Sequence, residues 1–221
     1  MLLAVDTSTA HVGLAVYDGS QVIGEYTWRS NQHHTVELAP AVAELLARSG
    51  LSMDGIRALG VALGPGSFTS LRVGLSLVKG LALARHLPLL GIPTLDIYAA
   101  SQPVSKLPLL TAIQAGRGRL AVGGYKGMKK GWQATGSARV ASVDTLIEEI
   151  QTPTIVCGEF TAEERQRLVN RETIRLISPA QSVRRPSILA ELAWKRRQNG
   201  EADDEATLAP IYLHTAEPIP S

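Results

Sequence analysis

The order of strand-like and helix-like segments constrains the fold most, because the same order occurs twice within the 221 residues. Each copy begins with three strand-like segments and continues with helix, strand, helix, strand and helix. In the first copy, Asp18-Gly19 joins the second and third strands as a two-residue hairpin signal. The expected elements of the first copy span residues 2–6, 11–17, 21–28, 35–48, 56–63, 70–85, 89–91 and 94–101. Those of the second copy span residues 108–113, 119–125, 132–138, 143–150, 154–156, 162–169, 173–177 and 187–198.

Two copies of this order resemble the duplicated ribonuclease-H-like architecture of actin, sugar kinases and heat-shock ATPases. The resemblance implies an α/β fold with two domains. We place an N-terminal ribonuclease-H-like domain at residues 1–105 and a C-terminal ribonuclease-H-like domain with a tail at residues 106–221. The boundary falls in the Gln102-Pro103-Val104-Ser105 link. The tail begins with the polar residues 199–205, and the apolar residues 208–213 predict that it regains order.

The charge of the chain is small in total but uneven along its length. A content of 45% hydrophobic and 19% charged residues is typical of a globular protein, and a net charge of +2 predicts no strong attraction to nucleic acid or membrane. Residues 1–105 carry 13 charged side chains and residues 106–221 carry 29. A sparsely charged surface is easier to desolvate against another protein. In the second half, glutamates alternate with basic residues, which favours a solvated face over weak RNA contact. The basic residues are Arg165, Arg167, Arg171, Arg175, Arg184, Arg185, Lys195, Arg196 and Arg197.

Cysteine content and the length of apolar runs indicate the cellular compartment of the protein. The single cysteine, Cys157, rules out an intrachain disulfide, and its apolar neighbours predict an inert, buried strand residue. No run approaches the roughly 18 consecutive apolar residues of a membrane span. The N-terminal sequence lacks the basic head and long apolar core of a secretion signal. We therefore expect a cytoplasmic protein.

The segment Gly64-Pro65-Gly66-Ser67-Phe68-Thr69-Ser70-Leu71-Arg72 lies between a strand-like run and a helix-like run. Glycine and proline permit a sharp turn, and Ser67, Thr69 or Ser70 can cap the helix. Such a loop presents backbone N–H groups beside the helix dipole, an arrangement that is able to hold an anion. The segment lacks the Gly-x-x-x-x-Gly-Lys-Ser/Thr pattern of a P-loop, so we favour a tight turn without a ligand.

The first strand of each half tests whether the chain is an ATPase of this architecture. Such an enzyme needs a carboxylate at the end of both strands to hold a metal ion and the attacking water. The first half has Asp6, but the second half has the uncharged Gln114, and only Gly158 stands near the expected adenosine pocket. We therefore expect no independent ATP hydrolysis. We favour Asp6 as the acceptor that ties its own Thr-Ser-Thr turn.

Other hydrolase patterns are also missing from the sequence. His33 and His34 are adjacent, whereas the His-Glu-x-x-His pattern of a zinc protease places its histidines four residues apart. We expect His34 to cap or pack against the helix that follows it. The sequence has no Gly-x-Ser-x-Gly elbow. We therefore expect neither a metal nor a cofactor to be bound by this chain alone.

The helices expected at residues 35–48 and 70–85 are more apolar than packing on one sheet requires. Either both helices lie deep inside one domain, or another protein covers part of their surface. The residues alone leave both explanations open.

Several sequence runs resemble the TsaB (YeaZ) family. They are Met1 to Thr9, His34 with Glu37-Leu38-Ala39-Pro40, Gly64 to Gly74, Lys79-Gly80-Leu81-Ala82 and Pro210-Ile211-Tyr212-Leu213. The similarity is close over residues 1–100, and the Gly-Pro-Gly-Ser-Phe-Thr run is highly specific to that family. The chain departs from the family pattern at Ser70, at His214 and at Gln114-Ala115-Gly116-Arg117, where the family usually has glycine, arginine and an Asp-Ala-Arg run.

The resemblance implies a non-catalytic paralogue of TsaD, the subunit that transfers a threonylcarbamoyl group to the adenosine beside the anticodon in tRNA. It also implies that the two apolar helices contact TsaD, or a second copy of this chain when TsaD is absent, and that the ATPase TsaE joins the assembly. tRNA is then met only through the complex. ATP or ADP has a place at the interface of the assembled complex and not on the isolated chain.

We therefore expect a scaffold protein whose interface combines apolar side chains with two basic residues. The apolar residues are Leu38, Val42, Leu45, Phe68, Leu71, Leu75 and Val78, and the basic residues are Arg72 and Lys79. One rival is an enzyme, either a degenerate ATPase or a glycoprotease-like hydrolase. The other is a tRNA-binding module that uses the basic residues of the second half.

Overall fold

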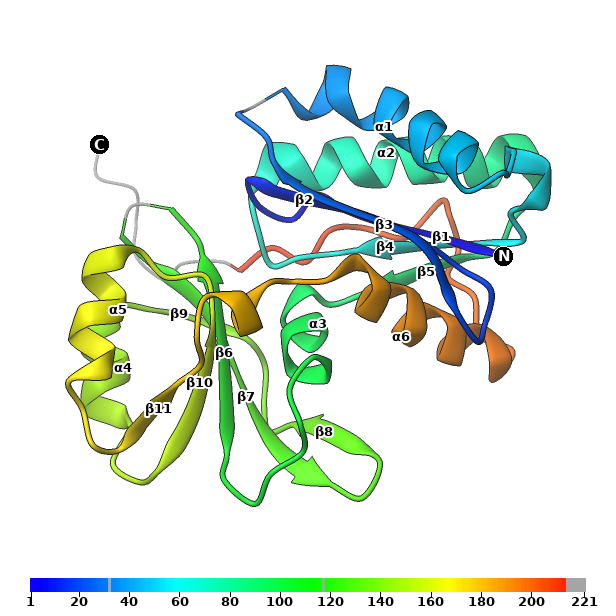
Figure 1. The fold of residues 1–221 in the computed structure, drawn as a ribbon. Coiled ribbons are helices and arrows are strands. Elements are labelled where there is room, and N and C mark those ends of the chain that lie inside the picture. Colours follow the sequence, from blue (N-terminus) through cyan, green and yellow to red (C-terminus); the bar gives the residue numbers. More distant parts are fainter. Residues whose placement is uncertain (32, 117, 214–221) are drawn as a thin grey trace.

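The computed structural model describes residues 1–31, 33–116 and 118–213. These residues form two lobes, each built on one β-sheet (Figure 1). Arg117 and His214, two of the positions that depart from the family pattern, lie outside the described residues.

The N-terminal lobe holds a five-stranded sheet with the order β3-β2-β1-β4-β5. Strand β1 pairs antiparallel to β2 and parallel to β4, and every residue of β1 and β4 is buried. Buried strands need cover on both faces of the sheet, and their uninterrupted apolar sequences fit that environment. The strands are β1 (Leu2–Asp6), β2 (His11–Tyr17), β3 (Val22–Arg29), β4 (Ala58–Ala62) and β5 (Leu89–Ile92).

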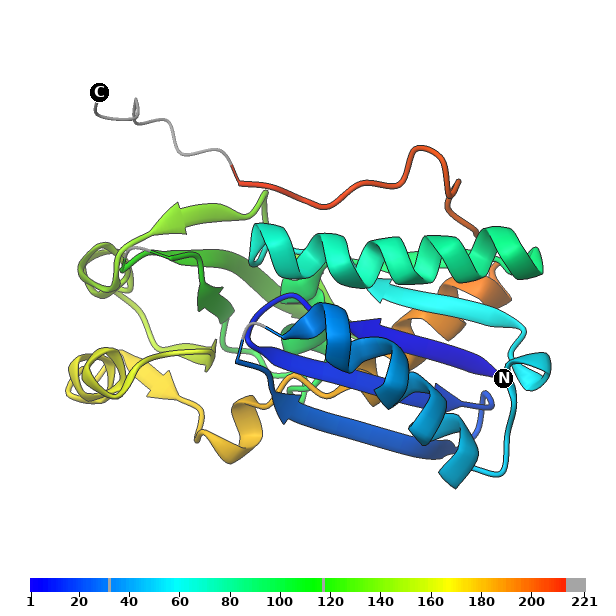
Figure 2. The same cartoon turned by 90° about the horizontal axis from the view of Figure 1, so that it is seen from above.

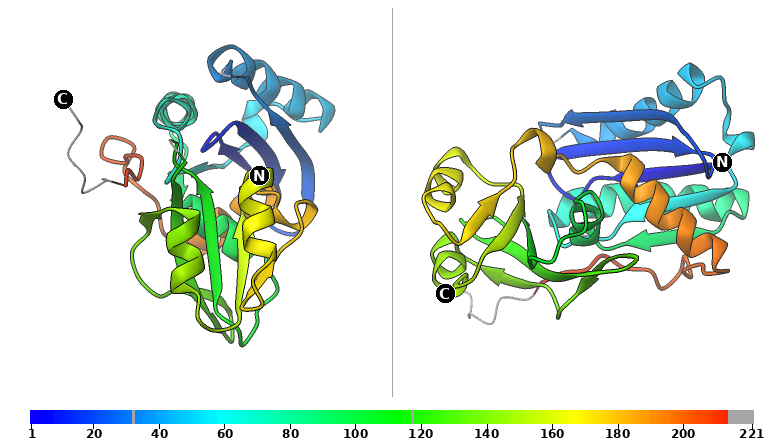
Figure 3. Two further views of the ribbon diagram at one scale, coloured as in Figure 1. Left: turned by 90° about the vertical axis from the view of Figure 1, so that its left-hand side faces the viewer. Right: turned by 60° about the horizontal axis from the view of Figure 1, so that its bottom comes forward.

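Three helices supply this cover. Helices α1 (His34–Arg48) and α2 (Phe68–Arg85) lie side by side on one face of the N-terminal sheet, and α6 (Pro186–Gln198) crosses the other face (Figures 1 and 3). The largest core cluster lies between the sheet and the first two helices. A short 3₁₀ helix, Met53–Gly55, precedes β4.

The C-terminal lobe holds a six-stranded sheet with the order β11-β10-β6-β7-β8, and β9 also pairs with β7. Helices α4 (Val143–Glu149) and α5 (Ala162–Val169) pack on one face of this sheet. Helix α3 (Thr94–Ala100) packs on the other. The strands are β6 (Leu109–Gln114), β7 (Leu120–Met128), β8 (Gly131–Ala134), β9 (Arg139–Ala141), β10 (Thr154–Gly158) and β11 (Ile174–Leu176). A second 3₁₀ helix, Ala180–Ser182, leads toward α6.

The two sheets and their covering helices confirm the duplicated ribonuclease-H-like architecture. The last strand of the N-terminal sheet ends at Ile92 and the first strand of the C-terminal sheet begins at Leu109, on either side of the expected boundary at residue 105. Two helices cross that boundary in opposite directions: α3 packs against β6, β7, β8 and β10, whereas α6 packs against the N-terminal strands. An amphipathic sequence pattern predicts that a helix has a buried face, but not which of two sheets receives it.

The tail also returns to the N-terminal lobe. The Asp203 N–H donates to the Leu89 carbonyl, and the Ile211 N–H donates to the Leu63 carbonyl at 2.7 Å. Figure 2 shows this segment running along the side of α2. Residues 208–213 are described, but they form neither helix nor strand.

One predicted strand differs from the structure. The segment expected at residues 132–138 is divided into β8, which pairs with Tyr125–Met128, and β9, which begins at Arg139 and pairs with Leu120–Val122. Gly136 and Ser137 lie in the break, where a residue without a side chain and a small polar residue favour a bend. Among the described residues, no helix combines the length and apolar character needed to cross a bilayer.

Candidate functional site

A buried turn at the end of β1 connects several elements of the protein. Asp6 Oδ1 accepts a hydrogen bond from the Ser8 N–H at 2.9 Å, which confirms the predicted role of Asp6 in tying its own turn. Thr7 Oγ1 donates to the Ser70 carbonyl at 2.7 Å, and the Ser8 and Thr94 hydroxyls share a bond of 2.7 Å. Asp6, Thr7, Ser8 and Thr9 are all buried. This Asp6–Thr9 turn therefore joins the start of α2 to the start of α3.

The Gly64–Ser67 loop packs directly on that turn. Gly64 has a φ of +97°, which suits glycine, and a Cβ atom on Gly66 would collide with the Ser8 carbonyl. The Ser67 N–H donates to that carbonyl at 2.7 Å, and the Gly64 N–H donates to Thr94 Oγ1 at 2.9 Å. The Gly64 and Ser67 N–H groups are thus used inside the protein and are not free to hold an anion. The loop is the tight turn that the sequence favours, and the Ser67 side chain caps α2.

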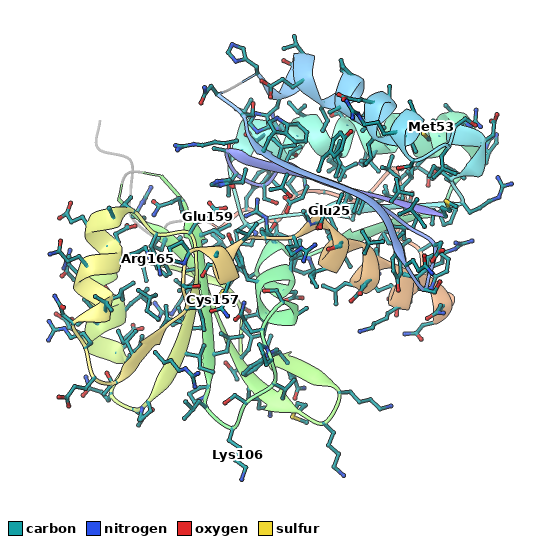
Figure 4. The ribbon with its side chains drawn as sticks, in the orientation of Figure 1. Glu25, Met53, Lys106, Cys157, Glu159 and Arg165 are labelled. Carbon is teal, nitrogen blue, oxygen red and sulfur yellow. The ribbon has the colours of Figure 1, made fainter. Side chains whose placement is uncertain are left out.

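Arg184 lies beneath this turn, at the junction of the two lobes. Its side chain is 2% exposed and forms ion pairs with Asp6 and with Glu159, the latter at 2.7 Å. The remaining N–H groups donate to Tyr98 Oη at 3.4 Å, to Thr9 Oγ1 at 3.1 Å and to the His11 carbonyl at 3.1 Å. We call Asp6, Thr9, His11, Tyr98, Glu159 and Arg184 the Arg184 network. Figure 4 shows Glu159 between the lobes.

The network fixes the charge of its members. Burial alone would raise the pKa of Glu159, but the nearby His11 ring, the Arg184 charge and the Thr9 hydroxyl outweigh it and lower that pKa to about 2. Burial alone would lower the pKa of Arg184, but the Asp6 and Glu159 carboxylates outweigh this effect and raise that pKa above its usual value. Both side chains are therefore charged across the physiological range.

A cleft of about 710 Å³ opens above the network between the lobes. Gln114, which stands where an ATPase needs an acid, lines this cleft and donates to Glu164 Oε2 at 2.7 Å. Both oxygens of Asp6 are engaged, one by the Ser8 N–H and the other by Arg184. A second carboxylate, that of the partly buried Glu159, accepts a hydrogen bond from the same guanidinium. Asp6 is thus neutralised by a cation of the protein itself.

The sequence did not indicate the Arg184 network. Arg184 was expected on a solvated basic face, and this prediction is wrong because the side chain is buried. Residues 6 and 184 are too distant in sequence for a local pattern to pair them. His34 is also buried, with its ring 3.2 Å from the Thr9 carbonyl, so it packs at the start of α1 as expected.

A second candidate site is an apolar groove on the outside of the N-terminal lobe. It has a volume of about 450 Å³ and lies between α1 and α2. Phe68 is 51% exposed at its edge, and Val36 on α1 is 67% exposed. We call this feature the α1/α2 groove. Its lining residues are Thr35, Leu38, Ala39, Phe68, Thr69, Arg72, Val73, Ser76 and Leu77.

A cluster of three side chains holds Phe68 in place. The Arg72 guanidinium lies 3.8 Å from the centroid of the Phe68 ring, and the Tyr212 ring lies 4.9 Å from it. Arg72 Nε also donates to Tyr212 Oη at 3.3 Å. The tail therefore supports the exposed aromatic residue at the start of α2.

The structure corrects most of the predicted apolar interface. Six of its side chains are no more than 6% exposed and are buried within this chain, so they cannot form the outer contact surface. Among the predicted residues, Phe68 and Arg72 are exposed, Lys79 is half-buried, and Leu38 lies at the bottom of the groove. The six buried residues are Leu38, Val42, Leu45, Leu71, Leu75 and Val78.

The outward side of the two helices has a different composition. On α1 it carries Val36, Ala39, Ala43 and Ala47, all exposed, and on α2 it includes Ser76 and Gly80. Ala39, Ala43 and Ala47 were not predicted as contact residues, because small side chains carry a weak hydrophobic signal. Their spacing of three and four residues along α1, counted from Val36, is the pattern that could have found them.

Comparison with known proteins places the chain in a family. The family model described as "TsaD: tRNA N6-adenosine threonylcarbamoyltransferase" matches residues 22–174. The tRNA threonylcarbamoyladenosine biosynthesis protein TsaB of Bacillus subtilis is 31% identical over 222 aligned positions, which cover 98% of this chain and 95% of that protein. A tRNA N6-adenosine threonylcarbamoyltransferase of Anaeromyxobacter dehalogenans is 32% identical over 123 positions, 48% of this chain and 37% of that protein.

A solved structure agrees over the full length. YeaZ from Pseudomonas aeruginosa superposes with a TM-score of 0.78 at 25% identity, covering 96% of this chain and 99% of that chain. Sequence and fold therefore match one family from end to end, and the chain belongs to the TsaB (YeaZ) family.

Proposed function

We propose that this chain is a non-catalytic subunit required for threonylcarbamoyl transfer to the adenosine beside the anticodon in tRNA. The transfer itself takes place on TsaD, with which this chain forms a heterodimer through the α1/α2 groove. Membership of the TsaB family supports a part in the biosynthesis of threonylcarbamoyladenosine. The match of the TsaD family model supports a shared ancestry with the partner.

The half-exposed Phe68 beside an apolar groove carries this proposal. An aromatic side chain held at its rim by Arg72 and Tyr212 loses little conformational entropy on docking. The small exposed residues of α1 allow a partner helix to approach closely. Because the partner matches the same family model, it is expected to present a comparable pair of helices, and the contact is then helix against helix.

The Arg184 network supports the non-catalytic part of the proposal. The Asp6 carboxylate is the only acid of the two strand ends, and an internal guanidinium already neutralises it. Gln114 supplies no charge at the other strand end. Metal-assisted hydrolysis in the cleft would need a free carboxylate to balance the ion.

The other members of the assembly follow from the same proposal. In the absence of TsaD, a second copy of this chain covers the α1/α2 groove and forms a homodimer. TsaE joins the heterodimer, tRNA is met only through the complex, and ATP or ADP binds at the interface of the assembled complex.

Reconstitution tests this function. TsaD and TsaE are mixed with tRNA and the threonylcarbamoyl donor, with and without this chain, and the modified adenosine is measured. We expect modification only when the chain is present. Equal modification in both mixtures would refute the proposed role.

The rival explanation, a degenerate ATPase or glycoprotease-like hydrolase, makes the opposite prediction for the isolated chain. Turnover of ATP or of a glycoprotein by the purified chain, with loss of that turnover in Asp6→Ala, would favour the enzyme.

A further inference from the structure

We propose that Arg184 is a positioning residue for the α1/α2 groove: through the Asp6–Thr9 turn, it holds the first turns of α2 in the orientation that presents Phe68 and Arg72. This inference rests on the proposed docking function. It assigns a role to a residue of the second half of the chain, between the C-terminal sheet and α6, in a surface formed by the first half.

The first step is the set of hydrogen bonds from Arg184 to the Asp6–Thr9 turn. The guanidinium donates to the Asp6 carboxylate, to Thr9 Oγ1 and to the His11 carbonyl, so it contacts both ends of the turn and the start of β2. On its other side it donates to Glu159, directly after β10, at 2.7 Å. A planar group with five donors fixes the relative position of these acceptors in a way that a single point charge does not.

The second step is the contact between the turn and α2. The Thr7 hydroxyl donates to the Ser70 carbonyl at 2.7 Å, in the first turn of the helix. A Cβ atom at Gly74 would collide with Thr7 Oγ1, so the helix lies directly on the Thr7 side chain. The Ser8 carbonyl accepts the Ser67 N–H at 2.7 Å, which fixes the capping residue itself.

The third step is the position of the groove residues. Phe68 follows the cap, and Arg72 lies one turn further along α2. A shift of the turn therefore moves Ser67 and Ser70, and with them the ring and the guanidinium at the rim of the groove. Every link from Arg184 to Ser70 is buried, so water cannot replace these hydrogen bonds without opening the core.

The chemistry of the network favours positioning over simple stabilisation. Asp6 and Arg184 are buried and the Glu159 side chain is 15% exposed, so all three charges lose hydration on folding. Apolar side chains of similar size often stabilise a core as well or better. Apolar side chains cannot donate directed hydrogen bonds to the oxygens of Asp6, Thr9 and His11.

The experiment compares Arg184→Met with Arg185→Met as a matched control. Arg185 is the next residue, but it is exposed and pairs with Glu25 on β3. Binding to TsaD is measured by titration at a temperature at which circular dichroism shows each variant to be folded. Amide exchange is followed at Ser67 and Leu71, whose N–H groups bond to Ser8 and Ser67.

We expect Arg184→Met to bind TsaD at least tenfold more weakly and to exchange faster at Ser67, whereas Arg185→Met matches the wild type in both readouts. Arg184→Lys keeps the charge with fewer donors, and we expect intermediate binding. Wild-type affinity in a folded Arg184→Met variant would overturn the inference.

A triple variant covers the case in which Arg184→Met does not fold. Asp6→Asn, Glu159→Gln and Arg184→Met together leave no unpaired buried charge. We expect this variant to fold and still to bind weakly. Full recovery of binding would show that the donors of Arg184 are dispensable. Failure of the wild type to bind TsaD at all would instead refute the proposed function.

Discussion

Arg184 and Asp6 are 178 positions apart in the chain, yet they form an ion pair in which neither side chain is more than 2% exposed. Arg184 lines the cleft between the two lobes. Both oxygens of the Asp6 carboxylate are used within the protein's own structure. The exposed Phe68 lies elsewhere, beside the α1/α2 groove.

Two glycines of α2 offer a matched test of how the helix lies on the turn. In Gly74→Ala the added methyl group meets Thr7 Oγ1, whereas in Gly80→Ala it meets open space. We expect Gly74→Ala to destabilise the fold by about 1–3 kcal/mol, because the collision breaks the bond from Thr7 to Ser70. Gly80→Ala should stabilise it by up to about 1 kcal/mol through helix propensity. Urea unfolding of both variants measures the difference, and equal midpoints would contradict the packing described.

Glu159 makes stability depend on acid pH. Its pKa is lowered to about 2 in the folded state, so its contribution is complete above the pKa of the unfolded chain and is lost as the pH falls through the folded value. We expect the free energy of unfolding to lose on the order of 3 kcal/mol from this residue between about pH 5 and pH 2. Chemical denaturation at several pH values measures this loss.

The matched control for this pH dependence is Glu148→Gln, a change at an exposed residue of α4. Glu159→Gln should flatten the acid limb of the stability profile, whereas Glu148→Gln should leave it as in the wild type. An acid limb of unchanged slope in Glu159→Gln would count against a charged Glu159 in the folded protein.

The sequence was a good guide to the elements and a weaker one to their packing. Strand–helix alternation and the Gly64–Ser67 loop are local signals, and β1, β2 and α5 have the expected bounds. Residues 18–21 join β2 to β3, in place of the expected two-residue Asp18-Gly19 turn. The exchange of α3 and α6 between the lobes has no local signal. It depends on which apolar face of which sheet is left uncovered after the strands have paired.

The candidate sites show the same difference between local features, which the sequence predicts, and packing, which it does not. The role of Asp6 in its turn followed from its neighbours, because a short carboxylate side chain accepts a hydrogen bond from the backbone N–H two residues later, here that of Ser8. Val42, Leu45 and Leu75 were expected at a partner and are buried in this chain instead, since an apolar helix position is equally suited to either environment. The resemblance points to this pair of helices, but only coordinates distinguish their inner from their outer sides.

The most direct test of the account is the affinity between this chain and TsaD in Phe68→Asp, with Val169→Asp as the control. Both residues are exposed and apolar, but Val169 lies at the end of α5 in the C-terminal lobe. A charge at the rim of the α1/α2 groove would have to be desolvated on docking, so we predict at least a hundredfold loss of affinity, worth about 2.7 kcal/mol. Val169→Asp should bind as the wild type does. Wild-type affinity in Phe68→Asp, or an equal loss in both variants, would contradict docking through α1 and α2.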